Sequence, residues 1–427
     1  MNVLHINTTG LAGGASRALW WLHVGLREEG HRSRMLTFDG PVPEKGVHRL
    51  GGGSCLWRAA HWLNRKAEAW TGLDGLLAPQ TFFFDPTPYR RADIINLRNL
   101  HGHRFSLWAL PRLERFAPLL WRLPDMWPLT GGCVHPMECT RWLTGCGQCV
   151  HLRSYPTSRV DHSALVFRAK RLIYSRINPV IVTPSEWLRR QVQASPLMAR
   201  FRVHAIPNGV DLRTFRPVDR AAARASLGLR EEEKVILFAA HNVADRLKGG
   251  DLLLGALSHL RGAGGLADVR LMTVGERAEG LTADLDWPVL DLGMVHSDRL
   301  LAAAYSAADV FVGPSRAESF GLVFAESAAC GLPAVAFRTT AIPGIVRHGR
   351  TGLLARPFDV RELARNLHTL LTDTEVRDRM SSECRAVAES EFDYRLMTGR
   401  YLRVYEEKLE ERARRRAEHA PEGGDDG

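Results

Sequence analysis

The chain has 427 residues, of which 45% are hydrophobic, and it carries a formal net charge of +10 at pH 7. This length predicts two or three globular domains, and the apolar content is enough to build their cores. No run of about 20 apolar residues occurs, which argues against a membrane-spanning helix, and residues 1–10 resemble a core strand rather than a signal peptide. We therefore expect a cytoplasmic protein whose positive charge favours an anionic partner, either the inner face of a membrane or a nucleic acid.

The first predicted strand, within VLHINTTG, leads to a glycine turn at Gly13 and Gly14. We expect a helix to follow, running through Gly25, with Ser16 as its N-terminal cap. Glycines allow a backbone to approach a diphosphate closely. The turn lacks the complete fingerprint G-x-G-x-x-G, so an ordinary turn is the alternative. Its position after the first strand favours phosphate binding.

Two polar residues in loops of the first half are candidate site residues. His101 lies in the loop after the strand in ADIINL, from Ala92, and is either functional or a histidine hydrogen-bonded at a strand end. Asp125, in LPDMWPLTGGC, either orients a hydroxyl group of an acceptor or packs in its loop beside Met126 and Trp127.

Four of the seven cysteines fall in one loop, residues 131–150, with the spacing C-x5-C-x6-C-x2-C; they are Cys133, Cys139, Cys146 and Cys149. Four thiols this close in sequence favour a structural zinc ion with tetrahedral coordination. Disulfides and free buried thiols are the alternatives. The absence of a secretory segment implies a reducing compartment, which disfavours disulfides.

Two stretches of the first half mix tryptophan with arginine, at residues 55–70 and 103–127. Amphipathic segments of this kind rest on lipid headgroups when their apolar face is not covered. The alternative is that these tryptophans belong to the core or to a lid.

In the middle of the chain, Asn208 and Gly209 form a turn signal, and Asp211 can accept backbone N–H groups there. The segment KVILFAAHNVADRLKGGDLLLGAL then predicts a strand, a loop and a helix, with Lys248 just before the helix. A loop lysine is often only solvated, but this position favours contact with an anion, and Arg246 is a second basic candidate.

The most informative segment is VGPSRAESFGLVFAESAACGLPAV, residues 312–335. A buried strand over 309–313 and a helix over 320–329 are predicted, so the helix start offers free backbone N–H groups to a phosphate; these residues are Ser319, Phe320, Gly321 and Leu322. Glu318 precedes the turn and can accept hydrogen bonds from sugar hydroxyls, whereas Glu326 in the helix can accept a pair from a ribose. The alternative is that both are solvated surface residues.

This segment, with its two glutamates separated by seven residues, resembles the retaining nucleotide-sugar glycosyltransferases of family 4. IVTPSEWL, IPNGVDL and the loop of Lys248 resemble the same family in the expected order. Strands alternate with helices in both halves, which predicts an α/β protein of two doubly wound Rossmann-like domains facing across a cleft. The resemblance implies that this fold is GT-B.

The resemblance also implies a domain organisation. An acceptor-side domain would span residues 1–205 and a nucleotide-sugar domain residues 206–392. A helix over 393–415 would cross back to the first domain. The tail, 416–427, is too polar and glycine-rich to pack, which predicts disorder.

Roles for single residues follow from the family. His101 would lie beside the transferred sugar, Lys248 would contact the diphosphate, and Gly275 and Val295 belong to segments that line the nucleotide base, either uracil or guanine. The chain departs from the family in three places: Val243 stands where the family has an arginine, and Arg98 and Pro124 stand where close relatives often carry histidine.

The predicted function is retaining transfer of a sugar from a UDP- or GDP-linked donor to a glycan, lipid-linked or small-molecule acceptor, with no cofactor required for catalysis. The cysteine loop resembles an insertion of bacterial family-4 enzymes that build exopolysaccharides. The expected partners are the donor, the acceptor and the surface of an anionic membrane, but no nucleic acid. The alternatives are an epimerase, a degenerate protein of this fold that binds without transferring, and a zinc-containing protein that binds nucleic acid.

Overall fold

The computed structural model describes residues 1–8, 13–38, 47–49, 55–82, 86–153, 159–262, 264, 266, 268–278, 285 and 287–418. The chain divides into two compact units. Unit 1 comprises residues 1–206 together with the chain from Met397 onward, and unit 2 comprises Pro207–Leu396. Residues 419–427 of the tail predicted to be disordered lie outside the described residues.

Unit 1 is built on one parallel sheet of seven strands in the order β3-β2-β1-β4-β5-β6-β7. The strands are β1 (Asn2–Asn7), β2 (Arg32–Thr37), β3 (Val47–Arg49), β4 (Ile94–Leu97), β5 (Leu119–Arg122), β6 (Val180–Thr183) and β7 (Val203–Ala205). Every residue of β4, β5 and β6 is buried. This is expected of a parallel sheet that helices cover on both faces.

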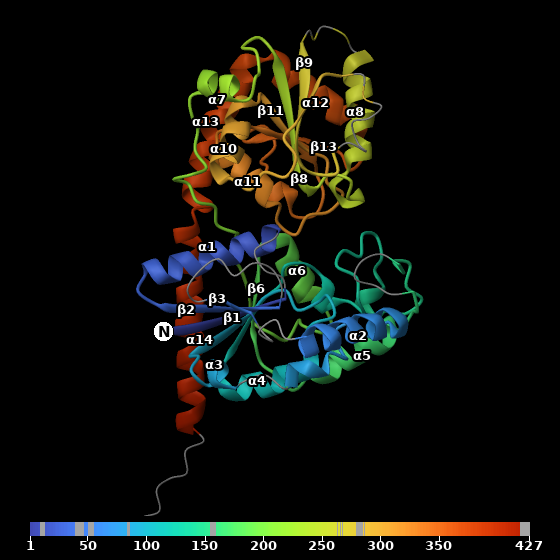
Figure 1. Cartoon of the computed structure of the whole chain (residues 1–427), viewed down its shortest axis with the longest axis vertical. Helices are drawn as coiled ribbons and strands as arrows, with labels where there is room; N and C mark the ends of the chain where they lie inside the picture. The colour runs from blue at the N-terminus through green and yellow to red at the C-terminus, as the bar shows by residue number, and fades with distance from the viewer. Residues whose placement is uncertain are drawn as a thin grey trace, which may run out of the picture. The chain divides into compact units, whose positions relative to one another are not determined.

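Helices lie on both sides of this sheet, with α1 on one side and α3 and α4 on the other (Figure 1). The helices of unit 1 are α1 (Gly14–Glu28), α2 (Cys55–Thr71), α3 (Thr87–Arg90), α4 (Leu110–Phe116), α5 (Ser163–Tyr174) and α6 (Glu186–Ala194). Short 3-10 turns are η1 (Pro79–Phe82), η2 (Leu107–Ala109), η3 (Trp127–Leu129) and η4 (Arg141–Leu143). The chain's last helix, α14 (Tyr394–Glu418), joins unit 1 from Met397 onward.

The prediction that Ser16 caps the first helix is wrong. The helix α1 starts two residues earlier, at Gly14, so Ser16 lies inside its first turn. Gly13 occupies the capping position without a side-chain hydrogen bond, and Ser16 Oγ instead accepts a hydrogen bond from Asn7 Nδ2 at 3.2 Å. The helix also continues past Gly25, to Glu28.

Unit 2 has a second parallel sheet, of six strands in the order β10-β9-β8-β11-β12-β13. The strands are β8 (Lys234–Asn242), β9 (Val269–Glu276), β10 (Val289–Asp291), β11 (Val310–Gly313), β12 (Ala334–Phe337) and β13 (Gly352–Ala355). The helices are α7 (Arg220–Ser226), α8 (Gly250–Gly262), α10 (Asp298–Ala307), α11 (Leu322–Ala329), α12 (Val360–Thr372) and α13 (Thr374–Glu391), with 3-10 turns η5 (Arg246–Lys248) and η6 (Ile342–Gly344).

Alternation along β8 divides the core of unit 2 in two. Val235 and Leu237 pack into the cluster that α10 and α11 cover, whereas Ile236 and Phe238 pack into the cluster that α8 and α12 cover. Successive strand residues point to opposite faces, so a run of apolar residues fills both layers. Figure 1 shows α10 and α11 on the opposite side of the sheet from α8. The predicted α/β class with two doubly wound domains is confirmed.

The strand order of each sheet changes direction beside its first strand. In unit 2 the chain runs from β8 outward to β9 and β10, and then returns to β11 on the other side of β8. Loops at the carboxyl ends of two such neighbouring strands diverge and leave a crevice, which is where ligands bind in open α/β sheets. Lys248 follows β8 and Glu318 follows β11, so the topology alone brings these two loops together.

Candidate functional site

Glu318 is the centre of the candidate site in unit 2. Lys248 Nζ and Ser315 Oγ both donate hydrogen bonds to Glu318 Oε1, at 2.8 and 3.0 Å. The backbone N–H of Glu318 donates to Thr340 Oγ1 at 2.9 Å. Glu318 is only 9% exposed, so it is not a solvated surface acid. A buried carboxylate needs such partners, and its other oxygen can still accept hydrogen bonds from a ligand.

Lys248 is held by an unusually close approach of two loops. Gly249, the next residue, has φ +73°, and a Cβ at this position would lie 2.0 Å from Pro314 O. Only glycine fits there, and this approach allows the ammonium group to reach Glu318. Burial alone would lower the pKa of Lys248, but the charge and the hydrogen bond of Glu318 raise it, so the lysine is charged.

The other basic candidates near Lys248 differ in their surroundings. The side chain of Arg246 is exposed, and its carbonyl oxygen accepts a hydrogen bond from Arg316 Nη1 at 2.8 Å. Arg316 also pairs with Asp251 at 2.6 Å and thereby ties the two loops together. The sequence analysis missed this role of Arg316. Val243 is buried in the core.

The helix α11 begins at Leu322, two residues later than predicted. Gly321 precedes it with φ +95°, a left-handed conformation that ends the preceding loop and starts the helix. The side chains of Phe320 and Leu322 are buried in the core of unit 2, where the Phe320 and Phe392 rings are 6.0 Å apart. These residues can therefore offer a ligand their backbone N–H groups but not their side chains. Ser319 is also buried.

Glu326 lies on the buried side of α11 and is 3% exposed. Its Oε2 accepts a hydrogen bond from the Tyr305 hydroxyl at 3.2 Å. Tyr305 comes from α10 and is fully buried. This contact fixes the Glu326 carboxylate from the side of α10.

Gly275 and Val295 lie near the carboxyl end of β9. Gly275 has φ +139°, and a Cβ there would lie 1.8 Å from Ala240 O, so the tight packing of β9 against β8 requires glycine. Its N–H donates to Gly293 O at 2.8 Å, which positions the segment containing Val295. The Val295 side chain packs partly against the core.

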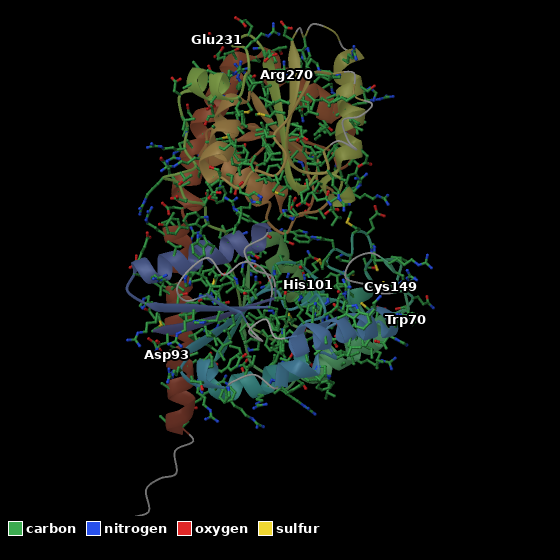
Figure 2. All side chains as sticks on the ribbon, viewed as in Figure 1. Trp70, Asp93, His101, Cys149, Glu231 and Arg270 are labelled. Atoms are coloured by element: carbon green, nitrogen blue, oxygen red, sulfur yellow. The ribbon has the colours of Figure 1, made fainter. Side chains whose placement is uncertain are left out.

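In unit 1 the structure pairs His101 with Asp125. His101 follows β4, Asp125 follows the neighbouring β5, and His101 Nε2 lies 3.0 Å from Asp125 Oδ2. Both side chains are buried, and the N–H of Trp127 donates to Asp125 Oδ1 at 2.8 Å. Burial alone would raise the pKa of Asp125, but the charge and hydrogen bond of His101 lower it. Asp125 is therefore an ionised partner that orients His101 (labelled in Figure 2).

Gly13 and Gly14 stand at the start of α1, beyond the carboxyl end of β1. Gly13 has φ +83°, and a Cβ there would meet nothing within 4 Å. The conformation thus favours glycine, whereas the surrounding space does not require it. Arg98, which follows β4, is buried and donates to the Tyr401 hydroxyl at 3.0 Å.

The sequence analysis missed a second ionic group of unit 1, which lies near the pair of His101 and Asp125. His103 Nδ1 is 2.7 Å from Glu68 Oε2 and 3.3 Å from Asp74 Oδ1, and Trp127 Nε1 donates to Asp74 Oδ2 at 2.7 Å. Among the described residues, Glu68, Asp74 and His103 are the only three or more His, Cys, Asp or Glu side chains whose possible metal-ligand atoms all lie within 4.8 Å of one another. Burial lowers the pKa of His103, but the hydrogen bonds of Asp74 and Glu68 outweigh it and raise the pKa to about 9. Burial alone would raise the pKa of Asp74, but the hydrogen bond and charge of the imidazolium outweigh burial and lower it, so Asp74 is the ionised partner, whereas burial raises the pKa of Glu68 to about 7.

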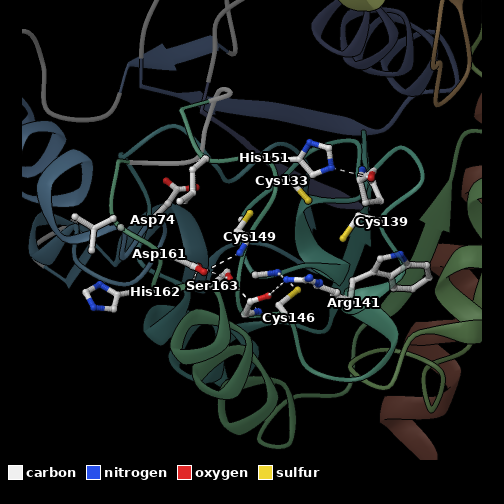
Figure 3. Close-up of a pocket in the computed structure, with 18 residues that line it drawn as sticks. Asp74, Cys133, Cys139, Arg141, Cys146, Cys149, His151, Asp161, His162 and Ser163 are labelled. Atoms are coloured by element: carbon white, nitrogen blue, oxygen red, sulfur yellow. Dashed lines mark hydrogen bonds between the residues drawn. The ribbon is translucent and has the colours of Figure 1, made fainter.

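The four loop cysteines line one pocket of unit 1 and are free and partly exposed (Figure 3); they are Cys133, Cys139, Cys146 and Cys149. The alternative of disulfide bonds between them does not occur in this structure.

Two Rossmann-like domains with parallel sheets, and loops gathered at the switch points, define the GT-B class of glycosyltransferase folds. Residues 233–373, which lie within unit 2, match the sequence model of the family described as "Glycosyl transferases group 1".

Curated relatives match part of the chain. The chain is 39% identical over 182 residues to a D-inositol 3-phosphate glycosyltransferase of Mycobacterium sp. (strain KMS), covering 40% of each chain. It is 36% identical over 230 residues to the protein of that name from Xylanimonas cellulosilytica, covering 50% of this chain and 53% of the relative. The match thus spans two-fifths to about half of the length of these relatives.

Solved structures resemble almost the whole chain. Sucrose-phosphate synthase from Thermosynechococcus elongatus has a TM-score of 0.71 at 21% identity, over 95% of this chain and 98% of that one. HepE from Anabaena, in complex with UDP-glucose, has a TM-score of 0.65 at 18% identity, over 95% and 100%. At these identities the likeness concerns the fold.

No helix in the described part of the chain is both long enough and apolar enough to cross a bilayer.

Proposed function

We propose that this protein transfers a sugar from a nucleotide diphospho-sugar, UDP- or GDP-linked, to an acceptor hydroxyl. The observation that carries the proposal is the pair of Lys248 and Glu318, 2.8 Å apart at the switch point of a glycosyltransferase group 1 domain. A lysine and a buried carboxylate at this place suit a ligand with an anionic part beside a hydroxyl-rich part. A nucleotide diphospho-sugar has both.

The donor would be held by charge, backbone and ribose contacts. Lys248 would neutralise the diphosphate, with Arg246 as a second cation, and the N–H groups at the start of α11 would complete the phosphate site. Glu318 would accept hydrogen bonds from the sugar hydroxyls. Glu326 would hold the ribose, and the segments of Gly275 and Val295 would line the base.

The reaction proposed is transfer with retention of configuration at the anomeric carbon. The bond between this carbon and the diphosphate oxygen breaks, and the bond to the acceptor oxygen forms on the same face. The leaving diphosphate takes the acceptor proton, so no strong protein base is needed. Lys248 would stabilise the charge that builds on the leaving group.

The acceptor side is assigned to unit 1. His101, oriented by the ionised Asp125, would contact the transferred sugar or the acceptor hydroxyl, and the Gly13–Gly14 turn would approach the diphosphate. The acceptor class proposed is a glycan or lipid-linked glycan of bacterial polysaccharide synthesis. The similarity to the Anabaena structure with UDP-glucose supports a UDP-linked donor, and the relatives named D-inositol 3-phosphate glycosyltransferase support a small polyol acceptor as the alternative.

Contact with an anionic membrane is proposed for α2. Trp62 and Trp70 on this helix are 53% and 78% exposed, and Lys66 lies 5.8 Å from the Trp62 ring centre. Figure 2 shows Trp70 at the periphery of unit 1. In the second tryptophan-rich stretch, by contrast, Trp121 and Trp127 are buried in the core and Trp108 is 36% exposed. The two strongly exposed tryptophans of α2 therefore carry the lipid-binding interpretation.

Co-sedimentation with vesicles tests this contact. Replacing Trp62 and Trp70 by serine should reduce binding to vesicles that contain anionic lipid by about tenfold. The variant loses the two apolar rings that would enter the headgroup region, one of which lies beside Lys66. Leu300→Ser removes an apolar side chain of unit 2 that is 41% exposed and serves as the control. Equal binding of the double variant and the wild type would contradict the assignment.

Product analysis tests transfer itself. The purified protein is incubated with UDP-glucose or other nucleotide sugars, with and without a mixture of glycan and polyol acceptors, and the products are examined by mass spectrometry and NMR. We expect a new glycoside with the donor's anomeric configuration, formed only with an acceptor. A changed sugar formed from the donor alone would indicate an epimerase.

Binding without transfer is the second candidate function. It rests on Val243, which is buried where the family's arginine is expected, so one phosphate contact is absent. Stoichiometric donor binding with no product from any acceptor would favour this alternative.

A further inference from the structure

The proposed transfer reaction uses none of the four thiols of the cysteine loop, although all four face one pocket. This pocket is partly open to solvent and lies between the loop and the start of α5. In Figure 3 the sulfur atoms of Cys133, Cys139, Cys146 and Cys149 gather around a common space. Four soft ligands around one space are the donor set that zinc prefers in structural sites.

The turn that carries two of these thiols is held in a conformation that side chains rarely adopt. Cys146 has φ +57° and Gln148 has φ +48°, with Gly147 at φ +102° between them. Left-handed backbone at two residues with side chains persists only when surrounding contacts fix it. The turn thus has a fixed backbone, which suits a ligand-bearing knuckle.

Contacts on both sides of the turn fix this conformation. On one side the Arg141 guanidinium donates to the carbonyl oxygens of Gly147, at 3.1 Å, and Gln148. On the other side the N–H of Gly147 donates to Ser163 Oγ at 3.0 Å, and the N–H of Cys149 donates to Asp161 at 2.7 Å. The backbone of the segment from Cys146 to Cys149 is therefore set by the fold.

One sulfur already accepts a hydrogen bond of the kind that supports a metal-bound thiolate. The N–H of Gly131 donates to Cys146 Sγ at 3.2 Å. A Cβ at Gly131 would lie 2.3 Å from Ser163 O, so this close approach requires glycine. Partners in the outer shell of a metal site orient its ligands in this way.

A buried cation lies behind the pocket. Lys170 is fully buried, and its Nζ donates to Trp127 O at 2.6 Å and to Thr130 O at 2.9 Å, in the segment that leads to Cys133. A zinc ion with four thiolates has a net charge of about −2. A buried charge of this kind requires a nearby compensating charge, which Lys170 supplies.

The separation of the sulfurs is wider than in a loaded zinc site. Tetrahedral coordination places sulfurs about 3.8 Å apart. In the described part of the chain no three of these thiols lie within 4.8 Å of one another. Rotation of a cysteine χ1 between staggered positions moves its sulfur by about 3 Å, so the site closes by side-chain rotation.

From these observations we propose that the four cysteines bind one zinc ion and that the ion positions Asp125 of the candidate acceptor site. The path is continuous: Thr130 Oγ1 donates to Cys133 O at 2.7 Å, Lys170 holds the carbonyls of Trp127 and Thr130, and the N–H of Trp127 holds Asp125. Zinc would fix one end of segment 125–133, and the other end carries the carboxylate that orients His101. Asp125 is a positioning residue in this account.

Metal content of the untagged, full-length protein tests the site. After dialysis against metal-free buffer we expect about one zinc per chain. Zinc should be lost in Cys146→Ser and Cys149→Ser and retained in Cys384→Ser, a buried thiol of unit 2 that contacts Thr351 O at 3.3 Å. Wild-type protein without zinc, or full zinc in the loop variants, would overturn the proposal. Iron with acid-labile sulfide would overturn zinc as the occupant.

Because the serine variants can fail to fold, the wild type supplies an independent test. The four loop thiols should react with Ellman's reagent only after a chelator removes the metal, and added zinc should protect them again. Four thiols that react equally fast with and without chelator would contradict the site.

Hydrogen exchange tests the positioning role without using activity. Removal of zinc should speed exchange at least tenfold in a peptide that covers residues 125–133, where the N–H of Trp127 and Gly131 are hydrogen-bonded. Strand β11 in unit 2 serves as the internal control. Unchanged exchange at 125–133 after zinc loss would limit the ion to the cysteine loop and overturn the positioning role.

Discussion

Single residues at the candidate donor site differ in burial and in their hydrogen-bond partners. Glu318 and Lys248 form an ion pair, whereas Glu326 accepts a hydrogen bond from the buried hydroxyl of Tyr305. The second glutamate is therefore held in place by a side chain of the neighbouring helix α10. A carboxylate fixed in this way suits the two neighbouring hydroxyl groups of a ribose. Binding them costs less conformational entropy when the carboxylate is already held in place.

Replacing Glu326 by alanine should weaken binding of the nucleoside diphosphate about 10- to 100-fold, because hydrogen bonds to a charged group are lost. Tyr305→Phe is the matched control, since it removes only the hydroxyl behind the carboxylate. We expect that variant to bind within about threefold of the wild type. Equal losses in both variants, with lowered melting temperatures, would indicate general damage to α10 and α11 instead.

At the scale of elements, the site depends on the contact between the loops that follow β8 and β11. Gly249 permits this contact, because its Cα lies against Pro314 O. The sequence places a strand, a loop and a helix here correctly, since the apolar run of β8 and the helical pattern of α8 are strong local signals. It does not show the contact with Pro314, because that depends on the pairing of β8 with β11.

The pair Gly249→Ala and Gly228→Ala separates backbone strain from loop contact. Both glycines have similar φ angles, +73° and +68°, but a Cβ at Gly228 meets nothing within 4 Å. Gly228→Ala should cost about 1 kcal/mol of stability from the left-handed backbone alone. Gly249→Ala should cost about 4 kcal/mol and lower nucleotide binding, because the two loops must move apart. Denaturant unfolding and calorimetry measure both quantities, and equal effects of the two variants would refute the role of the contact.

Boundaries and caps show where sequence patterns stop being sufficient. The helix start at Leu322 was misplaced by two residues because Gly321 adopts a left-handed conformation that the pattern does not reveal. Ser16 was wrongly assigned as a cap because glycine takes the capping position of α1. The parallel order of the strands, by contrast, follows from the alternation of strands and helices along the chain.

At the scale of the whole molecule, each sheet gathers residues that are distant in sequence. Glu68, Asp74 and His103 form one buried group, yet no spacing pattern joins them, because they come from α2, a turn and the loop after β4. The sequence could predict His101 and Asp125 only as separate candidates. Their 3.0 Å contact follows from the adjacency of β4 and β5 in the sheet.

The buried ionic group makes stability depend on pH. The pKa of His103 is raised from 6.5 to about 9 in the folded state, so its stabilising charge is fully present below pH 6.5 and is lost as the pH rises through 9. His103→Gln should therefore be less stable than the wild type by about 3 kcal/mol near pH 6, with a much smaller difference near pH 10. Thermal unfolding of both proteins across this range measures the difference. A stability difference between the two proteins that does not change with pH would show that His103 is not charged in the folded protein.

The account as a whole depends on Lys248 as the contact for a nucleoside diphosphate. The direct measurement is calorimetric titration of the wild type and Lys248→Met with UDP, GDP and the corresponding nucleosides, with Lys66→Met in unit 1 as the control. We predict selective binding of one diphosphate, weakened about 10- to 100-fold in Lys248→Met, with nucleoside binding and the control variant nearly unchanged. A folded wild type that binds neither diphosphate, or a Lys248→Met variant that binds as the wild type does, would contradict the account.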